Sequence, residues 1–117
     1  MLTVKDLDQT CDFYNTVLGM ETQIFSGNRR ALKFGDQKIN LHLFGSEPEP
    51  KAQEPTTGAA DLCFITDVPI DDVINHLKDR RVDIIEGPVG KTGALGPILS
   101  VYFRDPDGNL IEVSNAL

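Results

Sequence analysis

Long apolar runs are absent from this sequence of 117 residues. No stretch approaches the roughly 18 consecutive apolar residues of a membrane-spanning helix, and the N-terminus lacks the pattern of a signal peptide. Positive charge is also scarce, because 11 lysines and arginines face 18 aspartates and glutamates. The resulting net charge of −7 argues against nucleic acids and anionic membranes as partners.

Cysteine is rare as well. Cys11 and Cys63 lie too far apart to form a metal-binding or redox motif. We predict that both are buried, unpaired thiols in a reducing compartment, which favours a cytoplasmic location. The rest of the composition, 40% apolar and 25% charged, is typical of a single globular domain over residues 1–117.

The first part of the chain, module 1–44, predicts a strand, a helix and three further strands. A strand begins at 2–4, and a helix follows at 6–19, where Asp6 and Gln9 resemble a capping box and Gly19 stops the helix. One face of this helix carries four apolar residues at helical spacing: Leu7, Cys11, Tyr14 and Leu18. The three strands are expected at 20–25, 30–34 and 38–44, with a hairpin turn at 35–38.

Module 59–117 repeats this order after a proline-rich, charged linker at 45–58. Its expected elements are a strand at 61–65, a helix at 69–81 and strands at 83–86, 98–103 and 109–114. The segment GPVGKTG at 87–93 is not a phosphate-binding P-loop, because that motif would need glycine at the position of Ile85. We predict a flexible loop there instead.

Two short echoes support the repeat. LTVKDL at 2–7 resembles CFITDV at 63–68, and LHL at 41–43 resembles IEV at 111–113. Two βαβββ modules predict an α+β fold with both helices on one side of the sheet, which leaves the other face free to curve around a ligand.

Polar side chains alternate with apolar ones on three of the predicted strands. Asn40 and His42 share one face of their strand, Glu112 lies on one face of the last strand, and Asp61 shares a face with Cys63. By the repeat, His42 occupies the position that matches Glu112. The pattern leaves two interpretations open: a site for a divalent first-row metal built from these nitrogen and oxygen donors, or a solvated histidine and a surface acid.

Three segments carry a resemblance to a known family: LTVKDLDQTCDFYNTVLGME at 2–21, GAADLCFITDV at 58–68 and YFRDPDGNLIEVSN at 102–115. They resemble the vicinal oxygen chelate superfamily, which includes glyoxalase I, bleomycin-resistance proteins and extradiol dioxygenases. The chain looks closest to small single-domain glyoxalase-like proteins. The resemblance implies one cup-shaped, eight-stranded mixed sheet with the helices on its convex face. It also implies a divalent metal in the cup, such as Zn, Ni, Mn or Fe.

The family's ligands carry over unevenly to this chain. Glu112 matches the ligand on the eighth strand, and the fourth-strand ligand falls on His42, or on Asn40 if the hairpin register differs by two. Asp61 stands where the family often has a histidine on the fifth strand. The first-strand ligand would lie about two positions before Met1, so we expect the natural protein to begin a few residues upstream.

The same resemblance assigns residues to a substrate pocket. Tyr102 matches a cup-facing tyrosine of the fosfomycin-resistance branch, and Ser100, Cys63 and Asn40 are predicted to bind substrate. Three classes of function follow: a metal-dependent lyase or isomerase with Glu112 as the catalytic residue, a metal-free binding protein of the bleomycin-resistance type, and an extradiol dioxygenase or fosfomycin-type transferase. Asp61 in place of a histidine disfavours the third class. We also expect a homodimer.

Overall fold

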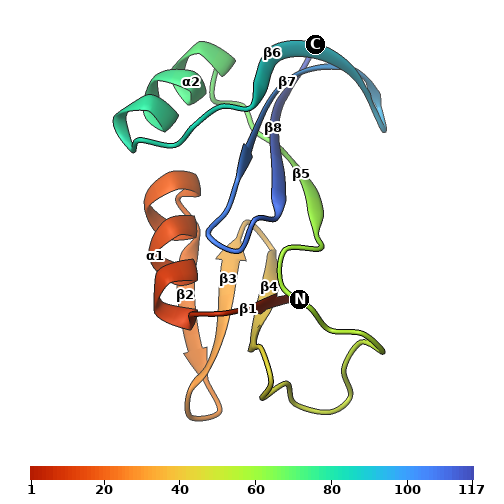
Figure 1. Cartoon of the computed structure of the whole chain (residues 1–117). Helices are drawn as coiled ribbons and strands as arrows, with labels where there is room; N and C mark the ends of the chain where they lie inside the picture. Colours follow the sequence, from red (N-terminus) through yellow and green to blue (C-terminus); the bar gives the residue numbers. More distant parts are fainter. The chain divides into compact units, whose positions relative to one another are not determined.

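The computed structural model describes residues 1–117, and the chain divides into two compact units. Unit 1 comprises residues 1–60 and 106–108, and unit 2 comprises residues 61–105 and 109–117. Each unit has one helix and one four-stranded sheet (Figure 1). The predicted α+β fold and its βαβββ order are confirmed, but the strands pair in two four-stranded sheets and not in one of eight strands. Neither helix is long and apolar enough to cross a membrane.

Unit 1 follows the predicted element order with small shifts at the ends of its strands. Its sheet has the strand order β1-β4-β3-β2, in which β1 is parallel to β4 and the other neighbours are antiparallel. The elements are β1 (Leu2–Val4), α1 (Leu7–Leu18), β2 (Glu21–Phe25), β3 (Arg29–Phe34) and β4 (Gln37–Leu43).

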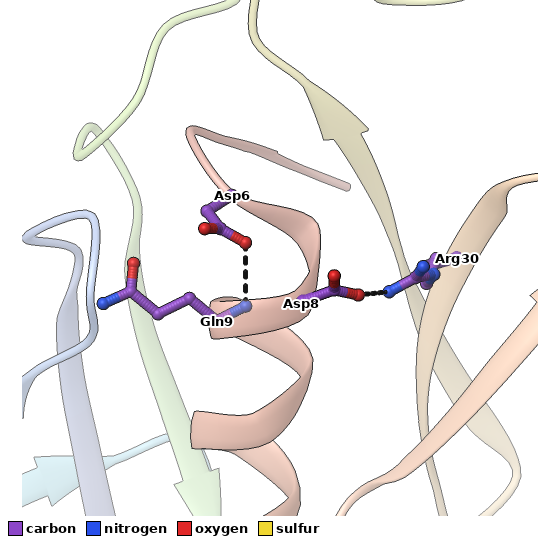
Figure 2. A network of polar contacts seen from close by, with 4 residues as sticks. All are labelled: Asp6, Asp8, Gln9 and Arg30. Carbon is purple, nitrogen blue, oxygen red and sulfur yellow. Dashed lines mark hydrogen bonds and ion pairs between the residues drawn. The ribbon is translucent and has the colours of Figure 1, made fainter.

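Helix α1 is fixed at both ends and joined to the sheet by an ion pair. The Asp6 carboxylate accepts a hydrogen bond of 3.0 Å from the backbone N–H of Gln9, which confirms the predicted N-cap (Figure 2). Gly19 ends the helix in the left-handed conformation, with φ of 69°. Arg30 of β3 pairs with Asp8 of the helix (Figure 2), so Arg30 marks the face of the sheet that packs against α1.

Unit 2 repeats this topology with the strand order β5-β8-β7-β6. Only β5 and β8 are parallel neighbours. The helix ends two residues earlier than predicted, because Arg81 has a positive φ of 59° that no α-helix continues through. The elements are β5 (Asp61–Ile65), α2 (Ile70–Asp79), β6 (Glu86–Gly93), β7 (Gly96–Arg104) and β8 (Leu110–Ala116).

The prediction of a flexible loop at 87–93 is wrong. The predicted strand at 83–86 is also wrong, because only Glu86 of that segment belongs to a strand. Residues 86–93 form β6, which pairs with β7 along its length except for a register break after Glu86. Gly87 lies in this break with φ of 111°, and a Cβ atom there would lie 2.4 Å from the carbonyl oxygen of Ser100. Glycine therefore lets the edge strand approach β7 at this point.

The turn between β7 and β8, at residues 105–109, uses both of its aspartates. The buried Asp105 carboxylate accepts hydrogen bonds from the backbone N–H (2.9 Å) and the side-chain amide (2.8 Å) of Asn109. The Asp107 carboxylate belongs to unit 1, where it accepts bonds from the Lys5 backbone N–H (2.9 Å) and the Thr10 hydroxyl (3.4 Å). These contacts account for the two acids without a bound cation.

Strand pairing corrects the sequence alignment of the two modules. Thr3 lies opposite His42 on the β1–β4 ladder, and Cys63 lies opposite Glu112 on the β5–β8 ladder. If His42 corresponds to Glu112, then their strand partners Thr3 and Cys63 also correspond. The sequence similarity of LTVKDL to CFITDV instead aligned Leu2 with Cys63. That echo is therefore one residue out of register.

Candidate functional site

Each sheet has a polar face on the side away from its helix. In unit 2 the alternation of β8 places Ile111 and Val113 in the buried core and leaves Glu112 on the opposite face. Strand pairing brings Cys63 and Tyr102 to either side of Glu112. The face therefore gathers a thiol, a phenol and a carboxylate at one level of the sheet.

Two fully buried serines hold the Glu112 carboxylate. The Ser100 hydroxyl donates a bond of 2.6 Å to Oε2 of Glu112, and its oxygen lies 2.6 Å from the Ser114 hydroxyl. Because Ser100 has a single hydroxyl proton, Ser114 is the donor in the serine–serine bond. Ser114 also donates a longer bond of 3.3 Å to Oε2, so its single proton is shared between Ser100 and Glu112. The network therefore holds one carboxylate oxygen with hydroxyl donors. Hydrogen bonds to an ionised carboxylate are shorter and stronger than bonds between neutral groups.

Tyr102 stands beside this carboxylate as a protonated phenol. Burial raises the pKa of Tyr102 to about 12, and hydrogen bonding to Glu112 and the negative charges of Glu112 and Glu86 act in the same direction. The phenol therefore remains a hydrogen-bond donor at neutral pH. The ammonium of Lys91 on β6 lies 5.6 Å from the centre of the Tyr102 ring.

Cys63 differs from the prediction that it is buried, because its side chain is exposed on the edge strand β5, while Cys11 is buried as expected. Its sulfur lies 3.7 Å from the Ser114 hydroxyl. Partial desolvation raises the pKa of the Cys63 thiol, and the charges of Glu112 and Asp61 raise it further although the Ser114 bond opposes them. At neutral pH Cys63 is a thiol and a weak nucleophile.

In unit 1 the corresponding polar face carries His42 and Asn40. His42 is 6% exposed, and its Nδ1 atom and the Oδ1 atom of Asn40 are buried without a hydrogen-bond partner. Burial lowers the pKa of His42, and the positive charge of Arg29 adds to this effect. The imidazole is therefore neutral at physiological pH, which is the form that accepts a hydrogen bond or binds a metal.

The structure brings the predicted residues together in two sets. Unit 2 holds Glu112, Tyr102, Ser100 and Cys63 as neighbours, and unit 1 holds His42 and Asn40 on alternate positions of β4. Asp61 lies at the exposed start of β5, opposite Leu110 rather than Glu112. Neither unit contains three histidine, cysteine, aspartate or glutamate side chains grouped so as to hold a metal ion.

Sequence reasoning missed Ser114 as a member of the site. The signal was present, because Ser114 follows Glu112 by two residues on the same strand and must share its face. Its contact with Ser100 depends on the pairing of β7 with β8, which places the two serines directly opposite each other.

The lowered pKa of His42 predicts a pH-dependent stability. The unfolded imidazole has its ordinary value of 6.5 and takes up a proton before the folded one does as the pH falls. The neutral His42 side chain therefore contributes fully to the free energy of unfolding above pH 6.5. This contribution is lost as the pH falls from 6.5 through the lower pKa of His42 in the folded chain.

We expect His42→Asn to lose less stability than the wild-type chain between about pH 8 and pH 5, as measured by urea unfolding with a chelator present. His76→Asn, which changes the other histidine, should retain the wild-type pH dependence. Equal curves for wild type and His42→Asn would contradict the prediction.

Residues 1–113 match the family described as the Glyoxalase/Bleomycin resistance protein/Dioxygenase superfamily. The chain is 56% identical to Virulence protein STM3117 of Salmonella typhimurium over 97% of this chain and 79% of that protein. It is 53% identical to Glyoxalase domain-containing protein RDO1 of Mycosarcoma maydis over 98% of this chain, but spans only 65% of that relative.

Solved structures agree with the fold. The crystal structure of Virulence protein STM3117 has a TM-score of 0.97 at 55% identity and covers 99% of this chain and 92% of its own. At 25% identity, a lactoylglutathione lyase from Agrobacterium tumefaciens has a TM-score of 0.72, with 98% of this chain and 89% of its own covered. An antibiotic binding protein from Streptomyces, TnmS3, has a TM-score of 0.74, also at 25% identity, with 99% and 91% covered.

Proposed function

The chain belongs to the glyoxalase/bleomycin resistance protein/dioxygenase superfamily, and on this premise we propose that it is a glyoxalase-type, metal-dependent lyase or isomerase. Its substrate is a small molecule with two adjacent oxygen atoms. The observation that carries the proposal is the carboxylate of Glu112, which two buried serines hold beside the protonated phenol of Tyr102. A positioned carboxylate next to a neutral hydrogen-bond donor suits proton transfer at a carbon next to a carbonyl.

Two of the proposed ligands are side chains of the types that bind divalent metals. His42 offers a neutral imidazole with a buried, unpartnered Nδ1 atom, and Glu112 offers a carboxylate, which together suit a first-row ion. We propose His42 and Glu112 as ligands, with Asp61 as a third ligand or as a hydrogen-bond acceptor beside them. A bound ion supplies Lewis-acid polarisation of the two substrate oxygens. The support for one shared site is the family and the equivalent strand positions of His42 and Glu112.

The residues of unit 2 then divide the proton chemistry among them. The Glu112 carboxylate removes a proton from the carbon that carries the first oxygen, a hydroxyl, and returns it to the neighbouring carbonyl carbon, while the hydroxyl proton passes to the second oxygen. Ser100 and Ser114 keep the carboxylate in one orientation throughout. Tyr102 donates a hydrogen bond to the oxygen on which negative charge develops. Cys63 lies on the same face and contacts the substrate as an uncharged side chain.

A second candidate function is a metal-free protein that binds a small molecule on the same polar faces. The observation that favours it is the lack of three grouped metal-binding side chains within either unit. Under this hypothesis the serines satisfy the half-buried Glu112 as an acceptor, and Tyr102 and Cys63 line the binding site. The relative TnmS3 is an antibiotic binding protein, which gives this alternative a precedent within the fold.

Metal binding separates the two functions. We expect the chain to bind Zn, Ni, Mn or Fe in calorimetric titrations, and we expect His42→Ala and Glu112→Gln each to weaken the affinity by about tenfold or more. The matched control is His76→Ala, because His76 is the other of the two histidines and lies on α2. It should bind metal as the wild type does.

The possible outcomes assign the ligands one by one. Loss of metal in Glu112→Gln but not in His42→Ala would make the fourth-strand assignment wrong and point to Asn40. No effect of either variant would favour the metal-free binding protein.

We also infer a cytoplasmic homodimer. Free thiols at Cys11 and Cys63 and the acidic composition support the location, and the family resemblance supports the dimer. Light scattering at micromolar concentration should give twice the mass of the chain, which is 12.9 kDa. A single-chain mass would contradict the inference.

A further inference from the structure

Lys33 and Lys38 lie directly opposite each other on β3 and β4, next to the turn that joins the two strands. Like charges at such a position destabilise an antiparallel pair. Both side chains are exposed, and neither forms an ion pair, although Glu21 lies opposite Lys33 on its other side. The pairing of the two lysines therefore weakens the hairpin, and no ion pair within the chain neutralises either ammonium group.

The two lysines lie on the face of the sheet away from α1. Arg30 and Leu32 define the helix-facing side of β3, because Arg30 pairs with Asp8 of α1 and Leu32 is fully buried. Lys33 alternates with them and thus points to the other face. On β4 the same face carries Lys38, Asn40 and His42, so the lysine pair and the unpartnered imidazole share one surface.

A third cation joins this surface through an aromatic ring. The Phe25 ring lies 5.1 Å from the guanidinium carbon of Arg29 and 4.6 Å from the ammonium of Lys38. The half-buried ring holds Lys38 and Arg29 near each other without neutralising either charge. Arg29 is close enough to His42 for its charge to lower the pKa of that histidine.

A hollow of about 500 Å³ lies between the two lysines and the turn. All of its lining residues except Gly35 have polar or charged side chains, and one of them, Asp36, is an acid: Gln23, Lys33, Gly35, Asp36, Gln37 and Lys38. A concave site with two unpaired ammonium groups concentrates anions, even in a chain with a net charge of −7.

We propose that Lys33 and Lys38 bind a carboxylate or phosphate group, and that this group belongs to the substrate. The assignment of this group to the substrate rests on the proposed function, whereas the binding of the anion does not. Lys38 and His42 are four residues apart on one strand, or roughly 13 Å. The substrate class is therefore a small anion whose charged group is separated from its adjacent oxygens by a linker of several atoms.

The test titrates inorganic phosphate, and separately succinate, into the labelled chain at constant ionic strength and follows backbone amide shifts by NMR. We expect shifts centred on residues 33–38 and an affinity about tenfold or more weaker in the double variant Lys33→Gln/Lys38→Gln. The control is Lys51→Gln/Lys78→Gln, which removes the same charge from the linker and from α2 and should bind both anions as the wild type does.

Stability distinguishes binding from a structural role. Lys33→Gln/Lys38→Gln should unfold at a higher urea concentration than the wild type, because the like-charge pair is gone. Equal weakening in the two double variants, or shifts spread over both units, would overturn the site. Stronger binding of phosphate than of succinate would assign the group as phosphate, and the reverse would assign it as carboxylate.

The same variants test the proposed function independently of the anion site. His42→Ala should lose metal and keep anion binding if both proposals hold. If metal binding is insensitive to His42 and Glu112 while Lys33→Gln/Lys38→Gln loses phosphate and succinate, the anion site stands and its assignment to an enzyme substrate falls.

Discussion

Glu112→Gln is expected to lower kcat/KM by about two to four orders of magnitude, the range over which a positioned general base contributes. Glutamine has nearly the same shape and still accepts a hydrogen bond from Ser100, but its amide does not take up a proton at neutral pH. The free energy of unfolding should therefore change little while turnover is lost. The assay uses a small substrate with two adjacent oxygen atoms, the class that the proposed function requires.

Glu86→Gln is the matched control for this experiment. Glu86 lies opposite Tyr102 on β6 and is exposed, so its removal changes the charge of the same face without touching the serine network. Turnover should remain within about threefold of wild type, as for a screened surface charge. Equal loss in both variants would indicate an electrostatic effect of the face, and unchanged turnover in Glu112→Gln would exclude Glu112 as the base.

Asp105→Ala is expected to destabilise the chain by about 3 kcal/mol, since hydrogen bonds to a buried charged group contribute about 1.5–3 kcal/mol each and are not additive. The substitution leaves the backbone and side-chain N–H groups of Asn109 without their acceptor in a site that water does not reach. The loss should be visible as a lower midpoint in urea unfolding with an unchanged slope.

Two variants check the mechanism of that loss. Asp105→Asn keeps an acceptor oxygen and should cost less than the alanine variant. Asp83→Ala removes an exposed carboxylate of unit 2 and should stay within about 0.5 kcal/mol of wild type. A loss below that margin for Asp105→Ala would mean that solvent replaces the carboxylate in the turn.

The parts of the fold that sequence predicted well are those that local chemistry determines. Asp6 and Gly19 bound α1 as their capping preferences indicate. The apolar face of α2 has the helical spacing that predicts it, with Ile70 and Leu77 buried. In contrast, β6 contains three glycines and a proline, which no strand propensity favours. This segment is a strand because it pairs with β7, and the local sequence does not predict that pairing.

The candidate site shows the same division. Period-two alternation was enough to place Glu112, His42 and Asn40 on the faces away from the helices. The serine network required the cross-strand register of β7 and β8, which follows from the turn at 105–109. The exposure of Cys63 required its position on an edge strand, because the alternation in DLCFI is the same for an edge strand and a central one.

The Asp107 contacts determine whether the two modules can be separated or exchanged. Residues 106–108 come from the second module in sequence but belong to unit 1, where the Asp107 carboxylate holds the Lys5 backbone and the Thr10 hydroxyl at the start of α1. A cut in the linker at 45–58 would therefore leave the first fragment without the acceptor for its Lys5 backbone N–H and its Thr10 hydroxyl. We therefore expect a chimaera of two relatives to keep these bonds only where the incoming half supplies a carboxylate at that turn.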